Sequence, residues 1–122
     1  MTDDHQWVLE TQRSSGGINI YSFNSETEKY ISSHSVQGTF FNLDYAETTD
    51  DYAFSVIGSL SSIYVLKFES NTFSVLQTLN TKKNFPKPSI TVDGSYIVFG
   101  DKTDVGNFLI QLYFYNDLAK EF

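Results

Sequence analysis

Short stretches in which hydrophobic residues are consecutive, or alternate with polar ones, cover most of the chain. Clusters of Gly, Asn, Asp and Ser separate them, and the three-to-four-residue spacing of an amphipathic helix is almost absent. This pattern is typical of many short β-strands joined by turns. It predicts strands over residues 6–11, 18–23, 29–33, 39–45, 52–57, 63–68, 73–79, 89–92, 96–99 and 108–115. Residues 116–122 could form a short helix or begin one more strand.

The predicted strands are of two kinds. Residues 63–66, 96–99 and 109–115 are nearly continuous apolar runs. A strand with one solvated face alternates between apolar and polar residues, whereas a strand that is buried on both faces does not. We therefore expect these three runs to be covered on both faces. Residues 29–33 are short and polar, and we expect them at an edge.

The strand pattern also repeats along the chain. An aromatic residue before a polar turn recurs at Phe23, Phe68 and Phe114, roughly 45 residues apart each time. The strand before it repeats as well, because residues 51–58 align with residues 93–100. Periods of about 40–50 residues, with about four strands in each, are typical of β-propellers.

At this point the residues resemble repeats of the WD40 family. Residues 89–101 are similar to the family's pattern of a strand, an Asp-Gly turn, a strand and a Gly. We expect the side chain of Asp93 to cap that turn and Gly94 to adopt a positive φ. Phe23-Asn24 and Phe68-Glu69 stand where the family has its Trp-Asp pair. The Trp-Asp pair and the family's Gly-His dipeptide are themselves absent, so the hydrogen-bond network that they form is not carried over.

The resemblance implies an all-β fold of about two and a half four-stranded antiparallel blades of a WD40-like β-propeller. It implies a partial blade over residues 6–35, a full blade over 36–80 and a blade without a clear last strand over 81–122. A β-sandwich or a small barrel is the alternative, because regularly spaced short strands suit those folds too. A propeller ring needs at least about four blades. We therefore expect this chain to be part of a longer propeller or of a larger assembly that covers its exposed blade faces.

Composition excludes several classes of protein. The chain is 40% hydrophobic and 19% charged, which is typical of a globular protein. Its net charge of −7 disfavours nucleic acid and anionic membranes as partners. It has no cysteine, no secretory signal and no apolar run long enough to be inserted in a membrane. These features predict a soluble, intracellular, cytoplasmic protein.

No pattern of residues predicts catalysis. The chain has only two histidines, His5 and His34, so a nucleophilic triad has few possible bases. The pair Asp50-Asp51 fits a hairpin turn, and the Gly-rich residues 14–17 lack the Lys of a phosphate-binding loop. Residues 101–107 offer oxygen ligands for Ca²⁺ but lack the EF-hand spacing, so we interpret them as a turn. We expect a protein that is not an enzyme and has no cofactor and no metal.

The sequence thus favours a protein–protein interaction or scaffold segment, since propellers bind partners through their loops. Its partners would be other protein chains or the remainder of its own propeller, and an oligomer or a complex is expected. The loop residues that we expect to contact a partner are Thr49, Asp50, Asp51, Lys82, Lys83, Lys87, Asp101 and Asp104. The alternative is a compact β-sandwich that binds a carbohydrate or a small ligand through its aromatic residues.

Overall fold

The computed structural model describes residues 6–11, 18–36, 45–49, 53–70 and 72–122. Every regular element within these ranges is a β-strand, so the all-β class expected from the sequence is confirmed. The strands are β1 (Trp7–Thr11), β2 (Ile18–Asn24), β3 (Lys29–Val36), β4 (Tyr45–Thr48), β5 (Phe54–Gly58), β6 (Ser62–Glu69), β7 (Thr72–Asn80), β8 (Ser89–Ile90), β9 (Tyr96–Lys102) and β10 (Phe108–Phe114).

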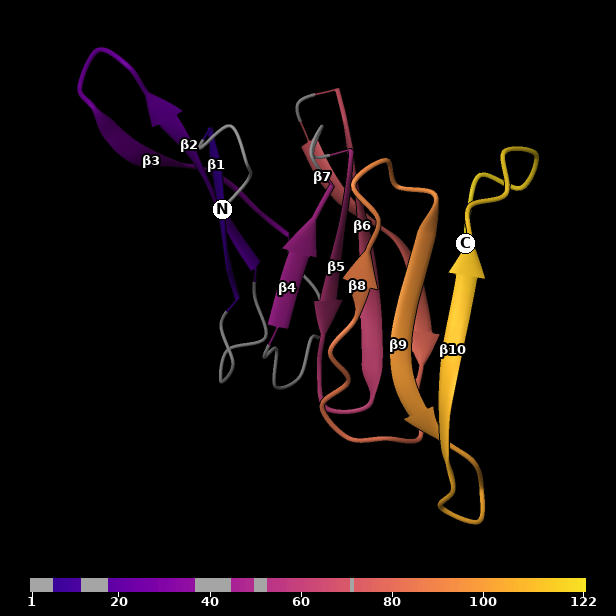
Figure 1. Ribbon diagram of the computed structural model, residues 1–122. Helices are drawn as coiled ribbons and strands as arrows, with labels where there is room; N and C mark the ends of the chain where they lie inside the picture. The colour runs from indigo at the N-terminus through magenta and orange to yellow at the C-terminus, as the bar shows by residue number, and fades with distance from the viewer. Residues whose placement is uncertain (1–5, 12–17, 37–44, 50–52, 71) are drawn as a thin grey trace.

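The strands form three antiparallel sheets that lie side by side (Figure 1). The first sheet has the order β1-β2-β3, the second β4-β5-β6-β7 and the third β8-β9-β10. In each sheet every strand pairs with the next one along the chain, as in the meander of a propeller blade. Neighbouring sheets meet where β4 contacts β1 and β8, and where β3 contacts β7. The fold is thus a partial β-propeller, with one four-stranded blade between two three-stranded ones.

The three sheets are copies of one unit, because their strand registers correspond. The second and third strands of the full blade, β5 and β6, correspond to β1 and β2 in the first sheet and to β9 and β10 in the third. A β-bulge follows Ile20 in the first sheet, and another follows the equivalent Val65 in the second. The equivalent cross-strand pairs are Leu9↔Ile20, Val56↔Val65 and Val98↔Leu112.

Two hydrophobic cores lie between the sheets. We call the side of a sheet that faces the preceding sheet its upstream side, and the opposite side its downstream side. The core between the first and second sheets holds Ile18, Ile20, Ile57, Leu66 and Phe73. The core between the second and third sheets holds Val56, Ile63, Val65, Leu79, Ile90, Ile97 and Phe99. Successive side chains of a strand point to opposite faces, so β5 and β6 contribute to both cores.

The predicted Asp-Gly turn before β9 has the expected geometry. The carboxylate of Asp93 accepts the hydroxyl proton of Thr91 at 2.8 Å and the backbone N–H of Ser95 at 3.0 Å. Gly94 has a φ of 74°, a conformation that a residue with a Cβ adopts only with strain. The turn therefore fixes where β9 begins, and with it the register of the third sheet.

Most predicted strands agree with the structure to within about three residues at each end, and two places differ by more. The strand predicted over 39–45 lies mostly outside the described residues, and β4 runs instead over Tyr45–Thr48. Residues 116–122 form neither a helix nor a further strand. They form a turn in which the side chain of Asn116 accepts the N–H groups of Leu118 and Ala119 at 3.0 Å, and a bridge from Asn116 to Glu121 closes it. An Asx side chain that bonds its own following backbone favours such a turn over a helix.

Candidate functional site

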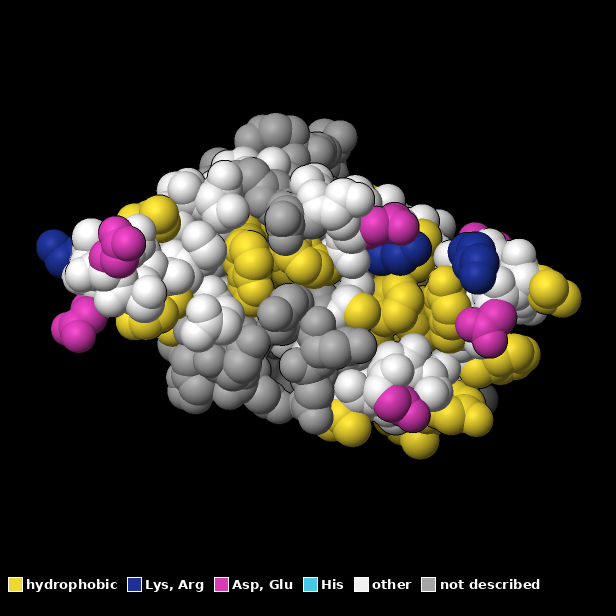
Figure 2. Space-filling view, turned by 90° about the horizontal axis from the view of Figure 1, so that it is seen from above, with side chains coloured by type: hydrophobic (Ala, Val, Ile, Leu, Met, Phe, Trp, Pro, Cys, Tyr) yellow, Lys and Arg dark blue, Asp and Glu magenta, His cyan; other side chains and the backbone are white. Residues whose placement is uncertain are grey.

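The downstream side of the third sheet is an exposed apolar surface, which we call the C-terminal open face. Its strongly exposed members all come from alternate positions of β10, where side chains share one side of the sheet. They are Phe108 (71% exposed), Ile110 (67%), Leu112 (63%) and Phe114 (64%), and Tyr96 (47%) and Val98 (38%) of β9 lie beside them. Figure 2 shows hydrophobic side chains gathered at the surface on the side of the molecule where Figure 1 places the third sheet. Contiguous apolar surface of this kind is a candidate interaction site.

The same register positions are buried in the other two sheets. Ile18 and Ile63 occupy the position of Ile110, and all three belong to the downstream sides of their sheets. Ile18 and Ile63 are fully buried, as are Ile20 and Val65, which occupy the position of Leu112. What buries them is the next sheet along the chain. The C-terminal open face therefore has the composition of a blade interface, with its side chains in solvent.

A glycine in this interface allows the next blade's loop to approach closely. A Cβ added to Gly58 would lie 2.1 Å from the carbonyl oxygen of Pro86, which belongs to the loop that leads into the third sheet. Gly58 pairs with Ile63, and Gly100 pairs in the same way with Ile110. The C-terminal open face thus repeats the glycine as well as the apolar residues.

An aromatic contact across the interface also recurs. The ring of Trp7 in the first sheet lies 5.3 Å from that of Phe68 in the second. At the equivalent positions of the following interface, Phe54 lies 5.2 Å from Tyr115. Aromatic pairs at such distances stabilise an interface beyond their buried area. Tyr96 holds the position of Trp7 and Phe54 in the third sheet and is 47% exposed.

The upstream side of the first sheet, at the other end of the molecule, carries more polar side chains, together with the rings of Phe23 and Tyr30, which lie 5.3 Å apart. Here the hydroxyl of Tyr21 donates a hydrogen bond of 2.6 Å to the carboxylate of Glu10, and this bond raises the pKa of Tyr21. The hydroxyl of Ser35 lies 2.9 Å from the side-chain oxygen of Asn19 and donates to it. We call Glu10, Asn19, Tyr21 and Ser35 the N-terminal polar face. The two outward sides of the molecule therefore differ in chemistry.

Four of the loop residues expected to contact a partner come together at one end of the molecule. The carboxylate of Asp101 accepts the backbone N–H groups of Lys82 and Lys83, both at 2.9 Å, and that of Lys102 at 2.8 Å. Burial of Asp101, which is 4% exposed, would raise its pKa, but these N–H donors and the side chain of Gln111 outweigh burial and lower it. The ammonium group of Lys82 pairs with the carboxylate of Asp104. Asp101 thus fastens the loop between β7 and β8 to the end of β9.

Thr49 and Lys87 are the other described residues among those expected to contact a partner. Thr49 is 1% exposed, and its hydroxyl accepts the N–H of Phe54 at 3.2 Å, so it holds the chain between β4 and β5. Asp50 and Asp51 lie outside the described residues. Lys87 is exposed between two buried prolines, Pro86 and Pro88. Contact of these loop residues with a partner remains a prediction.

The candidate metal loop uses its carboxylates for other contacts. Asp101 binds backbone N–H groups and Asp104 pairs with Lys82. Within the described ranges, no three His, Asp or Glu side chains lie close enough together to hold a metal ion. These ranges also contain no helix that is long and apolar enough to cross a membrane.

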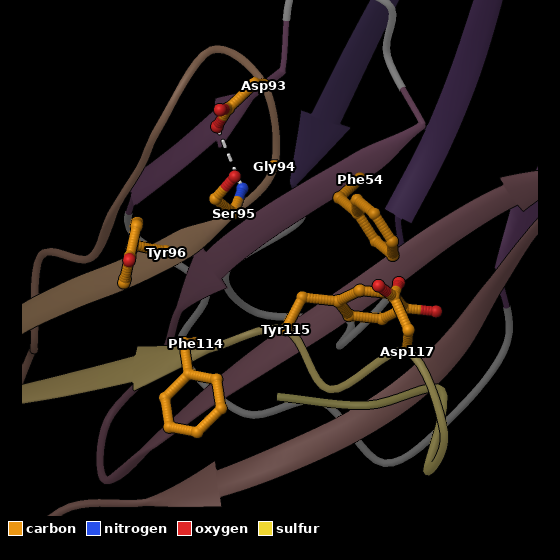
Figure 3. A pocket seen from close by; sticks show the side chains of 8 residues that line it. All are labelled: Phe54, Asp93, Gly94, Ser95, Tyr96, Phe114, Tyr115 and Asp117. Carbon is orange, nitrogen blue, oxygen red and sulfur yellow. Dashed lines mark hydrogen bonds between the residues drawn. The ribbon is translucent and has the colours of Figure 1, made fainter.

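A pocket of about 470 Å³ lies where the turn before β9 meets the end of β10 (Figure 3). Aromatic side chains and two carboxylates line it, from Phe54, Asp93, Gly94, Ser95, Tyr96, Phe114, Tyr115 and Asp117. The backbone N–H of Ser95 and the hydroxyl of Thr91 lower the pKa of Asp93 by bonding its carboxylate. The rings of Phe54 and Tyr115 pack on each other and on Phe122, so they already contribute to the contact between the second and third sheets.

Exposed blade faces were expected from the sequence, but the residues of the C-terminal open face were not among the expected site residues. Residues 109–115 were expected to form a strand buried on both faces, and the structure shows that prediction to be wrong for one face of β10, which is exposed. The signal that could have found it is the alignment of 109–115 with 63–68. That alignment makes residues 109–115 the third copy of a strand that a following sheet covers in the first two copies.

Comparison with solved structures supports the fold. A functionally unknown protein from Desulfotomaculum acetoxidans matches 94% of this chain with a TM-score of 0.72 and 14% identity. A protein from Lactobacillus plantarum matches 99% of it with a TM-score of 0.72 and 12% identity. A putative 6-phosphogluconolactonase from Bacteroides uniformis matches 96% with a TM-score of 0.73 and 11% identity. The chain spans 36%, 38% and 36% of the length of these three proteins, respectively.

These likenesses concern the fold alone, because the identities are low. No model of a protein family matches the sequence, and no curated protein matches it either. The chain is similar to about a third of each of these longer structures, as expected for part of a propeller.

Proposed function

We propose that this chain is a non-catalytic scaffold segment of a WD40-like β-propeller, which acts by protein–protein interaction within a longer propeller or a larger assembly. It would work in the cytoplasm without a cofactor. Its role would be to present a rigid set of sheets and loops to other protein surfaces. The C-terminal open face would be its main contact.

One observation carries this proposal. A single register position is held by Ile18, Ile63 and Ile110, and its side chain is 0% exposed in the first two sheets and 67% exposed in the third. Isoleucine, leucine and phenylalanine side chains gain about 1.5–3 kcal/mol each on full burial. We therefore expect a surface that carries several of them at interface positions to be covered by another protein surface.

The WD40-like part of the proposal draws support from the turns. Asp93-Gly94 forms the tight turn that the resemblance implies. Phe23 and Phe68 lie near the ends of β2 and β6, where the family has its Trp. The side chain of Asn24 accepts the N–H groups of Glu26 at 2.9 Å and Thr27 at 3.1 Å, so the residue after Phe23 caps the turn.

The test is the size of the assembly that contains the protein in its native cells. Leu112→Lys places a charge in the middle of the C-terminal open face, and we expect the protein to leave the assembly. Val105→Lys is the matched control, because Val105 is 82% exposed and lies in the loop between β9 and β10. Gel filtration with light scattering would report the masses. A Leu112→Lys protein that elutes with wild-type mass would contradict the proposal.

A small ligand is the second candidate, and the pocket beside the turn favours it. Its lining combines four aromatic rings with the carboxylates of Asp93 and Asp117, a composition that suits a cationic or sugar ligand. A panel of glycans and amines, read by the quenching of Tyr and Trp fluorescence, would test it. Saturable binding that Tyr115→Ala abolishes would favour this candidate.

A further inference from the structure

The interface between the second and third sheets shows what the C-terminal open face requires of a partner. Ile90 of β8, together with Ile97 and Phe99 of β9, covers Val56, Ile63 and Val65. The contact uses the first two strands of the third sheet, β8 and β9, each with bulky apolar side chains on the upstream side. It is completed by an aromatic ring at the position of Tyr115.

A second copy of this chain would offer its first sheet, and that sheet lacks two of these elements. Glu10 stands where the other sheets have Ile57 and Phe99, since the equivalent pairs are Glu10↔Asn19, Ile57↔Tyr64 and Phe99↔Gln111. In addition, the part of the first sheet that the structure describes has no strand in the position of β4 or β8. It does offer an aromatic ring, Phe23, at the position of Tyr115.

Docking of a second copy would be unfavourable because of Glu10. Its carboxylate would be removed from water and set against Val98, Ile110 and Leu112, and among the described residues its hydrogen-bond partner is the hydroxyl of Tyr21. Burial of a carboxylate among apolar side chains without a cation is strongly disfavoured.

We propose that the C-terminal open face docks the upstream side of a β-blade of different sequence, and that Glu10 prevents a second copy of this chain from taking that place. This inference rests on the proposed function. It adds that the partner presents bulky apolar side chains at the positions of Ile90 and Phe99, and an aromatic ring at that of Tyr115. It also assigns Glu10 a role in specificity. The third sheet has Phe99 at the equivalent position, and Phe99 packs in the interface that this sheet forms.

The experiment uses the chain as its own probe. Wild-type chain is immobilised, and the analyte is a Leu112→Lys copy, whose own open face is blocked. We expect Glu10→Ile in the analyte to tighten binding at least about tenfold, which corresponds to about 1.4 kcal/mol. Glu10→Leu serves as a second variant, and Glu26→Ile, in the exposed turn after β2, is the control for added surface hydrophobicity.

Two results would overturn the inference. An analyte that keeps Glu10 and binds as tightly as the Glu10→Ile analyte would show that a second copy is accepted. Folded Glu10→Ile and Glu10→Leu analytes that bind no better than the Glu26→Ile control would show that Glu10 does not decide the partner. Neither result depends on whether Leu112→Lys removes the protein from its native assembly, so failure of the proposed function would be recognised separately.

Discussion

The downstream sides of the second and third sheets have nearly the same side chains in the same register, but different surroundings. Val56, Ile63 and Val65 are 0% exposed, whereas their equivalents Val98, Ile110 and Leu112 are 38%, 67% and 63% exposed. The difference lies in the neighbour, because the second sheet is followed by the third, whereas the third sheet has no following sheet among the residues that the structure describes. The same kinds of side chain thus form an interface on the downstream sides of the first two sheets and are left exposed on that of the third. The two surfaces can therefore serve as controls for each other.

The largest expected effect comes from equivalent substitutions on the two surfaces. Ile63→Ala removes buried methyl groups and leaves a cavity, and we expect it to lower the free energy of unfolding by about 3 kcal/mol. Ile110→Ala, at the same register position, should change it by less than about 0.5 kcal/mol in the isolated chain. Denaturant unfolding would measure both. Equal losses would break the comparison, because they would mean that the C-terminal open face is covered in the isolated chain.

A second effect should come from the carboxylate that fastens the covered interface. Asp101→Asn replaces the charged acceptor of three backbone N–H groups with a neutral amide oxygen, and we expect a loss of about 2 kcal/mol at neutral pH. Because the native state lowers the pKa of Asp101, its contribution is present above the unfolded value of about 3.9 and is lost as the pH falls through the native value. The stability difference between wild type and variant should therefore shrink below about pH 4.

Unfolding measured across that pH range tests this prediction. Asp104→Asn is the control, because Asp104 is exposed and its ion pair with Lys82 lies at the surface. A constant gap between wild type and Asp101→Asn from about pH 7 to about pH 3 would show that the carboxylate does not stabilise the loop through its charge.

A smaller effect is expected at the C-terminal turn. The side-chain amide of Gln77 donates to the carbonyl of Phe122 at 2.7 Å and accepts its N–H at 2.9 Å, so it binds the backbone as a neighbouring strand would. We expect Gln77→Ala to cost about 1 kcal/mol and to increase hydrogen exchange in residues 116–122. Thr78→Ala, at an exposed neighbouring position of β7, is the control. Unchanged exchange in the turn would contradict the prediction.

The sequence predicted the class of fold and most strands because their signals are local. Alternation, β-branched residues and turn residues such as Asp93-Gly94 act over a few positions, and β2, β6 and β10 begin within about one residue of their predicted starts. The spacing of Phe23, Phe68 and Phe114 then indicated the repeat. The strand registers correct its last member by one residue, because Tyr115 holds the position of Phe23 and Phe68. The WD40 assignment itself remains a proposal.

The candidate site was harder to predict, because exposure depends on neighbouring sheets. The apolar run of residues 109–115 correctly reports an interface position, but nothing within the run tells whether its partner is present. Residues 63–66 were expected to be covered on both faces, and this is confirmed because they line both cores. The same expectation for residues 96–99 is wrong, because one face of that strand is exposed. The sequence placed Asp101 and Thr49 in loops and suggested that they contact a partner. Their buried positions could not be predicted, because their hydrogen bonds are made with backbone groups that only the folded chain brings close.

The most direct test of a covered C-terminal open face is the accessibility of Ile110 in the native assembly. The chain has no cysteine, so Ile110→Cys and Val105→Cys each introduce a single reactive thiol. In the isolated chain both should react with a maleimide at similar rates. In the native assembly, we expect the thiol at position 110 to react at least about tenfold more slowly, while the thiol at position 105 is unchanged. Equal rates at both positions in the assembly would contradict the claim that a blade covers this face.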